Sequence, residues 1–235
     1  MEFTFLMPCL NEAETLAFCI GEAGSAIRRL GLDAEILVAD NCSRDGSPDI
    51  ARDNGARVVN VTQAGYGSAV IGGIQAAKGR YVIMGDCDGS YDFAHPDLFV
   101  DELRKGAKLV VGDRFAGGIE PGAMPWSHRW GVPLLSVLAR RRFGTDVRDF
   151  HCGLRGFERQ MALELNLCCS GMEFATELIA RFAQNGAAIG QVPTPLRKDK
   201  RSGKPHLRTF RDGFRHLRFI LFCNINSCEN RRKTT

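Results

Sequence analysis

The strongest constraint on the fold is an alternation of short apolar runs with amphipathic stretches in the first half of the chain. The apolar runs predict strands at 3–7, 35–39, 57–61, 81–84 and 108–111. The stretches between them predict helices over 12–30, 48–54, 67–78 and 96–105, each followed by a glycine placed as a C-terminal cap: Gly31, Gly55, Gly79 and Gly106. This alternation predicts an α/β chain with a mostly parallel sheet flanked by helices.

Polar segments follow four of the predicted strands. They occupy residues 8–12, 40–46, 63–68 and 86–89. Ligands of parallel α/β sheets gather at the carboxyl ends of the strands, where loops and helix N-termini meet. We therefore expect all four segments to face one cleft at one edge of the sheet.

Two carboxylates stand at the end of the strand predicted at 81–84. Asp86 and Asp88 form a D-x-D pair there, and such a pair binds a hard divalent cation when both side chains enter a cleft. Mg²⁺ or Mn²⁺ between these carboxylates and a diphosphate would offset the charge that develops on a leaving group. Taken alone, such a pair is more often part of a surface turn, so its context has to decide.

A second acidic turn supplies part of that context. Asp40 follows the strand predicted at 35–39 and can accept hydrogen bonds from ribose hydroxyls or a base edge, whereas Asp45 suits a turn that caps the next helix. Gly65 and Gly67 precede another predicted helix, where their backbone could approach a phosphate.

Charge is distributed unevenly along the chain. Residues 195–235 carry 12 Lys and Arg against 3 acids, whereas residues 1–194 carry 19 against 24. An acidic body with a basic tail indicates an anionic partner. The tail lacks interleaved aromatic residues and any nucleic-acid reading motif, so we expect no nucleic acid among its partners. We expect one domain over residues 1–206 and a functional tail over residues 207–235.

The tail predicts a basic amphipathic helix. Its apolar positions recur at helical spacing, and its arginines recur one position later: Leu207, Phe210, Phe214, Leu217 and Leu221, then Arg208, Arg211, Arg215 and Arg218. This pattern is typical of a helix at an anionic membrane surface, although a helix packed on the domain would share it.

Compartment and membrane attachment follow from three further features. Nine irregularly spaced cysteines without CxxC pairs predict reduced thiols. The N-terminus lacks the features of a signal peptide, and no apolar run reaches the length of a transmembrane helix. We therefore expect a cytoplasmic protein that binds peripherally to the cytoplasmic face of a membrane.

The βα alternation ends near residue 114. A Gly/Pro-rich stretch over 117–125 leads into an arginine-rich helix predicted at 126–142. A loop of this length is typical of a mobile element that covers a substrate.

Seven motifs, in this order and spacing, carry a family resemblance. They are P-x-x-N-E at 8–12, the Asp40 turn, G-x-G-x-A at 65–69, D-x-D-G-S at 86–90, V-G-x-R-F at 111–115, D-F-x-C-G-L-R at 149–155, and Gln-Val-Pro at 191–193. From about residue 3 to about residue 221 the chain resembles family-2 glycosyltransferases of GT-A (Rossmann-like) fold. Within that family it resembles dolichyl-phosphate mannose synthase and related polyprenyl-phosphate glycosyltransferases.

The resemblance implies roles for individual residues. Some relatives have a Gln as a further metal ligand where this chain has Ser90, so the third ligand stays open. Asp149 would be a base or acceptor-orienting group, or a structural partner of Arg148 or Arg155. The other implied roles are donor binding by Pro8, Leu10, Glu12 and Asp40, metal binding by Asp86 and Asp88, and binding of the acceptor phosphate by Arg114, Arg129 and Arg201.

The implied activity is transfer of a hexose from a GDP- or UDP-sugar to a polyprenyl or dolichyl phosphate, metal-dependent and inverting. Such an enzyme would serve glycan assembly for the cell envelope. Two alternatives stay open: a transferase of the same fold acting on a soluble saccharide, and a nucleotide-binding module without catalysis.

Overall fold

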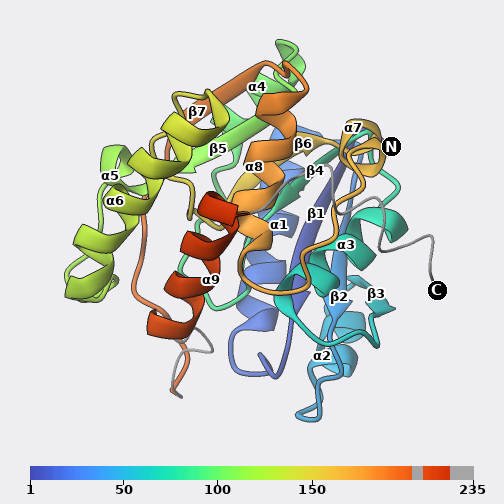
Figure 1. Cartoon of the computed structure of the whole chain (residues 1–235). Helices are drawn as coiled ribbons and strands as arrows, with labels where there is room; N and C mark the ends of the chain where they lie inside the picture. The colour runs from blue at the N-terminus through green and yellow to red at the C-terminus, as the bar shows by residue number, and fades with distance from the viewer. Residues whose placement is uncertain (203–208, 223–235) are drawn as a thin grey trace.

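The computed structural model describes residues 1–202 and 209–222. Its centre is a seven-stranded sheet in the order β3-β2-β1-β4-β6-β5-β7 (Figure 1). β6 is antiparallel to both β4 and β5, and the other neighbouring strands are parallel. The strands are β1 (Phe3–Cys9), β2 (Ala34–Asp40), β3 (Arg57–Asn60), β4 (Tyr81–Met84), β5 (Leu109–Asp113), β6 (Arg155–Glu158) and β7 (Ile189–Pro193).

Helices flank this sheet in two packed groups. In the first group α1 contacts α2, and an ion pair of Arg29 with Asp97 joins α1 to α4. In the second group α3 contacts α7 and α8, and α8 contacts α6 and α9; α8 and α9 lie in front of the sheet in Figure 1. The helices are α1 (Leu16–Leu30), α2 (Ser47–Asp53), α3 (Tyr66–Ala76), α4 (Asp97–Arg104), α5 (Arg114–Gly117), α6 (Trp126–Phe143), α7 (Arg159–Glu164), α8 (Phe174–Gln184) and α9 (Thr209–Phe222).

The predicted βα alternation is confirmed. All five predicted strands and all four predicted helices are present, and every residue of β1 and of β4 is buried, as expected for central strands covered on both faces. Gly31 adopts the left-handed conformation of a C-terminal cap, with φ of 58°. Gly79 is not such a cap: a Cβ there would lie 2.4 Å from the carbonyl carbon of Phe3, so this glycine permits close backbone approach instead.

The C-terminal helix α9 packs on the domain through residues outside the apolar stripe that the sequence singled out. His216, Phe219 and Ile220 are buried, whereas Phe214 and Leu221 of the expected apolar stripe are 66% and 51% exposed. Two further members of the predicted pattern, Leu207 and Arg208, lie outside the described residues, as does the predicted domain boundary at 206–207. The helix is therefore docked through one face and leaves a second apolar face open.

Within residues 1–202 and 209–222, no helix combines the length and the apolar character needed to cross a bilayer. In the same residues six cysteines are free thiols, but Cys168 is disulfide-bonded, so the expectation of reduced thiols throughout was wrong at this position.

Candidate functional site at the carboxyl edge of the sheet

The four polar segments meet at one edge, as expected. The Asn11 backbone N–H donates to Ser43 Oγ at 2.8 Å, which joins the segments after β1 and β2. Asn41 Nδ2 donates to the carbonyl of Gln63 at 2.8 Å, which adds the segment after β3. Thr15 Oγ1 donates to the carbonyl of Cys87 at 2.7 Å and brings in the segment after β4. Hydrogen bonds of three side chains, those of Ser43, Asn41 and Thr15, therefore hold the four segments together.

Asp40 and Asp45 divide the two roles considered for the second acidic turn. Asp45 Oδ1 accepts from Ser47 Oγ at 2.6 Å and from its backbone N–H at 3.1 Å, the hydrogen bonds of a turn that caps α2. Asp40 Oδ2 accepts from the backbone of Cys42 and Ser43, but its Oδ1 is buried without a hydrogen-bond partner among the described residues. A buried acceptor of this kind suits a ligand donor such as a ribose hydroxyl.

Gly65 and Gly67 are glycine for a reason that the sequence did not indicate. A Cβ at Gly65 would lie 2.1 Å from the carbonyl oxygen of Ser170, and one at Gly67 would lie 2.0 Å from that of Cys169. The loop that follows α7 thus packs directly on the N-terminal turn of α3. These glycines allow two protein segments to approach, which the expectation of an open phosphate-binding turn left out.

Three carboxylates form the centre of the site. Burial and the negative charge of Asp88 raise the pKa of Asp86 to about 6. Burial, with the negative charges of Asp88 and Asp86, raises the pKa of Glu12 to about 7 against the lowering effect of Arg201. Glu12 follows β1, where it was expected to bind the donor. It also belongs to the same negative cluster as Asp86 and Asp88.

Ser90 orients one carboxylate of this cluster. Asp88 Oδ1 accepts from Ser90 Oγ at 2.6 Å and from the Ser90 backbone N–H at 2.9 Å. Ser90, which stands where some relatives have a further metal ligand, thus fixes the rotamer of Asp88.

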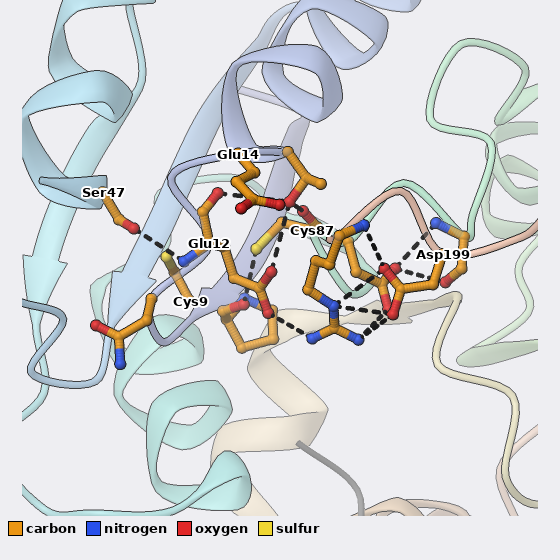
Figure 2. A network of polar contacts seen from close by, with 12 residues as sticks. Cys9, Glu12, Glu14, Ser47, Cys87 and Asp199 are labelled. Carbon is orange, nitrogen blue, oxygen red and sulfur yellow. Dashed lines mark hydrogen bonds and ion pairs between the residues drawn. The ribbon is translucent and has the colours of Figure 1, made fainter. Parts of the chain in front are cut away.

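Arg201 lies at the centre of the negative cluster. Its Nη1 donates to Glu12 Oε1 at 2.8 Å, its Nη2 donates to Asp88 Oδ2 at 3.1 Å, and its Nη2 also meets Asp199 Oδ2 at 2.5 Å. Figure 2 shows Glu12 and Asp199 converging on the same guanidinium from opposite sides. Arg201 therefore binds protein carboxylates here, and its expected contact with an acceptor phosphate stays a prediction.

The segment 197–202 brings Arg201 to this position by crossing the D-x-D loop. The Arg197 backbone N–H donates to the carbonyl of Ser90 at 2.9 Å, and that of Lys200 donates to the carbonyl of Asp88 at 3.0 Å. Ser202 Oγ then donates to Glu14 Oε1 at 2.5 Å. The chain after β7 thus folds back over the D-x-D loop, as the prediction for Arg201 required.

The donor set of the cluster fits a hard divalent cation. Asp86 and Asp88 offer carboxylate oxygens, the ligands that Mg²⁺ and Mn²⁺ prefer, and Glu12 is near enough for their charges to raise its pKa. Burial first, and the charge of Asp88 second, raise the pKa of Asp86, and a bound cation would counter both effects. A cation at Asp88 would approach Oδ2, beside the positive charge of Arg201, since Oδ1 already accepts two hydrogen bonds from Ser90.

Arg114 and Asp149 pair with each other at the end of β5. Both side chains are buried, and Asp149 oxygens accept from Arg114 Nε and Nη2. Asp149 was expected to act as a base or to pair with Arg148 or Arg155, and its ion-pair partner is Arg114 instead. Arg155 donates to three backbone carbonyls, so its own charge is used elsewhere.

Arg129 lies apart from the other two arginines, on the first turns of α6. It lines a cavity of about 420 Å³ together with Phe115, Ile119, Trp126 and Trp130. Both tryptophans are largely exposed, and their rings meet edge to face at 6.2 Å. The three predicted acceptor arginines thus have three separate sets of neighbours.

The remaining donor candidates are placed by β1. The carbonyl of Pro8 accepts from the Cys87 thiol at 3.3 Å, and Leu10 is exposed at the end of the strand. Tyr66, which the sequence did not single out, stands beside Asp86 and lowers its pKa through a hydrogen bond. Asp199 was also missed, because nothing in the sequence places it against a loop that precedes it by more than 100 residues.

Comparison with known protein families decides the classification. The model of the family described as Glycosyl transferase family 2 matches residues 4–165. The chain belongs to this family. The match begins in β1 and runs past the D-x-D loop and the Arg114–Asp149 pair. It therefore includes Glu12, Asp86 and Asp88 and ends before Arg201.

Two curated relatives from Haloferax volcanii agree with this classification. The low-salt glycan biosynthesis hexosyltransferase Agl6 is 36% identical over 218 residues, which are 92% of this chain and 52% of that protein. This chain thus spans about half the length of that relative. A dolichyl-phosphate hexose transferase is 33% identical over 180 residues, which cover 77% of this chain and 76% of that protein.

Solved structures agree on the fold. The glucosyl-3-phosphoglycerate synthase of Mycobacterium tuberculosis, crystallised with Mn²⁺, UDP-glucose and phosphoglyceric acid, matches with a TM-score of 0.73. It is 23% identical, and the match covers 97% of this chain and 80% of that one. The predicted GT-A fold is confirmed.

Proposed function

We propose that this chain transfers a hexosyl group from a nucleoside diphosphate sugar to the phosphate of a polyprenyl-type lipid. The observation that carries the proposal is the cluster of Glu12, Asp86 and Asp88 at the carboxyl edge of the sheet, in a family-2 chain. The 33% identical relative is named as a dolichyl-phosphate hexose transferase, which supports the choice of acceptor.

The donor end of the site suits a nucleoside diphosphate. Asp40 Oδ1 is buried without a hydrogen-bond partner among the described residues, next to Asn41 and Ser43. A ribose hydroxyl would supply the missing hydrogen bond. Asp86 and Asp88 would hold Mg²⁺ or Mn²⁺, which supplies positive charge to the departing diphosphate. A solved structure of the same fold holds Mn²⁺ with UDP-glucose.

The acceptor end offers a cation beside an apolar cavity. Arg129 and the two tryptophans line the same cavity, so one charged head and the first units of an apolar chain could be bound together. Arg114 directly precedes Phe115, which lines this cavity, on the same short helix α5. This combination favours an amphiphilic phosphate over a sugar hydroxyl.

The reaction requires little acid–base help from the protein. An oxygen of the lipid phosphate attacks the anomeric carbon, the bond from that carbon to the β-phosphate oxygen breaks, and the nucleoside diphosphate leaves. A phosphate monoester is already largely ionised near neutral pH, so no base has to remove a proton. Both oxygens of Asp149 accept hydrogen bonds, from Arg114 and the His151 backbone, which fits a positioning role.

Membrane contact would follow from the exposed apolar and basic surface of α6 and α9. Trp126 and Trp130 on α6 and Phe214 on α9 are exposed, as is Arg211. Tryptophan and arginine are favoured where a protein meets an anionic bilayer surface.

The direct experiment is a transfer assay. Purified protein with Mn²⁺ is incubated with a panel of UDP- and GDP-hexoses and a polyprenyl phosphate, and the lipid fraction is analysed for a sugar–phosphate–lipid product. The proposal expects product with at least one donor and none with the D86N variant. A protein that glycosylates a soluble saccharide but no lipid phosphate would establish the alternative acceptor.

A further inference from the structure

Arg201 occupies the position from which a cation would neutralise the carboxylate cluster. Its side chain is only 13% exposed and contacts carboxylates from three separate segments: Glu12 after β1, Asp88 after β4, and Asp199. A partly buried guanidinium with this many acidic partners is positioned as a counter-ion. One of these partners, Asp88, belongs to the D-x-D pair.

Both oxygens of Asp88 accept hydrogen bonds in this arrangement. Oδ1 accepts two hydrogen bonds from Ser90, and Oδ2 accepts from Arg201 at 3.1 Å. A divalent ion needs at least one of these oxygens, and it is repelled by a guanidinium that stays on the other side of the same carboxylate. A cation at Asp88 therefore competes with Arg201 for this carboxylate.

Release of Arg201 from Asp88 would not free it from the site. Its Nε lies 3.0 Å from Asp199 Oδ1 and 2.9 Å from Asp199 Oδ2, and both residues lie on the segment that crosses the cleft. Asp199 can therefore keep its contact with the guanidinium when Arg201 leaves Asp88 and Glu12. An incoming diphosphate, with oxygens that suit a planar fork, is the anion that could take up the released charge.

We propose that Arg201 and the divalent cation compete for Asp88 and Glu12, so that the metal enters the site together with the nucleoside diphosphate and binds poorly without it. The proposal rests on the proposed metal-binding role of Asp86 and Asp88. By linkage, a nucleotide that holds the released Arg201 strengthens metal binding, and the metal strengthens nucleotide binding by the same factor. Arg201 would thus set the order in which the site is loaded.

Mn²⁺ titration of metal-free protein tests this without any sugar or acceptor. The signal of free aqueous Mn²⁺ in electron paramagnetic resonance gives the dissociation constant, first without nucleotide and then with saturating UDP or GDP. We expect R201Q to bind Mn²⁺ about tenfold more tightly than wild type without nucleotide, because a charged hydrogen bond no longer competes. With nucleotide, the advantage should shrink to less than about threefold, since Arg201 is then released in wild type as well.

The matched control is R197Q. Arg197 lies on the same segment and forms an ion pair with Glu22 at 2.8 Å, outside the carboxylate cluster. Its loss tests whether loosening the segment alone changes Mn²⁺ affinity, and we expect the affinity to stay within about twofold of wild type. If R201Q does not fold, R201K replaces it: lysine donates from one point and cannot bridge Glu12 and Asp88 as a fork, so binding about threefold tighter than wild type is expected.

Three outcomes would overturn the proposal. They are R201Q binding Mn²⁺ no more tightly than wild type without nucleotide, an equal gain with and without nucleotide, and an equal gain in R197Q. A separate result, unchanged Mn²⁺ binding in D86N, would overturn the metal role in the proposed function and would leave the competition itself without a site.

Discussion

Arg114 and Asp149 form a buried two-point ion pair, with Arg114 Nε 2.6 Å from Asp149 Oδ2 and Nη2 2.8 Å from Oδ1. Such a pair is costly to break from one side, because the remaining charge has neither water nor a partner. We expect R114A to lower the free energy of unfolding by about 3–5 kcal/mol.

A double-mutant cycle measures this coupling. Urea denaturation of R114A, D149A and the double variant should show the double variant losing clearly less stability than the sum of the single losses. Strictly additive losses would mean that the two side chains are not coupled. Activity of R114A then has to be compared at conditions where the variant is folded.

Gly67 tests the packing of the donor-side loop. In G67A a Cβ would overlap the carbonyl of Cys169, so we expect a loss of about 1–3 kcal/mol of stability and weaker nucleotide binding. The control is G21A, in the exposed interior of α1 with open space around the new Cβ, which should gain about 0.5–1 kcal/mol. Wild-type melting and nucleotide affinity in G67A would show that the contact with the 169–170 loop is unimportant.

The sequence predicted the part of the site that lies close to strand ends. Asp40, Asp86 and Asp88 follow apolar strands, and the parallel order of β1, β2 and β4 brings strand ends together, so their meeting was predictable. The antiparallel insertion of β6 between β4 and β5 was not, because periodicity gives the existence of a strand and not its neighbour.

Contacts between segments that are distant in the sequence could not be predicted for the same reason. Arg201 was expected near an acceptor phosphate, yet its position against Glu12 depends on the path of residues 197–202 across the cleft. The requirement for glycine at 65 and 67 depends on the loop at 169–170. The exposed face of α9 depends on which side of the helix α6 and α8 cover.

Glu12 gives a pH dependence of stability. Its pKa in the folded protein is about 7 against an ordinary value of 4.5, so the folded protein holds this proton more tightly than the unfolded chain. The resulting stabilisation is complete below 4.5 and is lost as the pH rises to about 7 and beyond. In metal-free buffer, wild type should therefore lose melting temperature relative to E12Q between pH 4.5 and 7.5. A difference in melting temperature that is constant over this range would contradict the raised pKa.

Membrane binding should depend on individual arginines of α9. Arg211 and Arg218 are exposed, whereas Arg215 is paired with Glu173 at 2.7 Å. Replacing Arg211 or Arg218 by Gln should weaken binding to anionic vesicles by about 1 kcal/mol each at low salt, and R215Q should weaken it less. Vesicle co-sedimentation measures this, and equal losses for all three variants would mean that the ion pair does not reduce the effective charge of Arg215.

The α6 cavity can be followed by its own fluorescence. Trp126 and Trp130 are the two tryptophans of the chain, and both line this cavity, so the emission of the protein reports on that surface. A short polyprenyl phosphate should shift the emission to shorter wavelength as it excludes water from the rings. Inorganic phosphate, which lacks the apolar chain, should not. No shift with the lipid at concentrations that support transfer would place the acceptor elsewhere.

The most direct test of the central claim compares two acceptors that differ only in the phosphate. A polyprenyl phosphate and the matching polyprenol are offered to the protein with Mn²⁺ and an active nucleotide sugar, and kcat/KM is measured for each. The phosphate as nucleophile predicts transfer to the polyprenyl phosphate, abolished by chelation of the metal and by D86N, and no measurable transfer to the polyprenol. Equal or faster transfer to the polyprenol, or to a neutral saccharide, would contradict it.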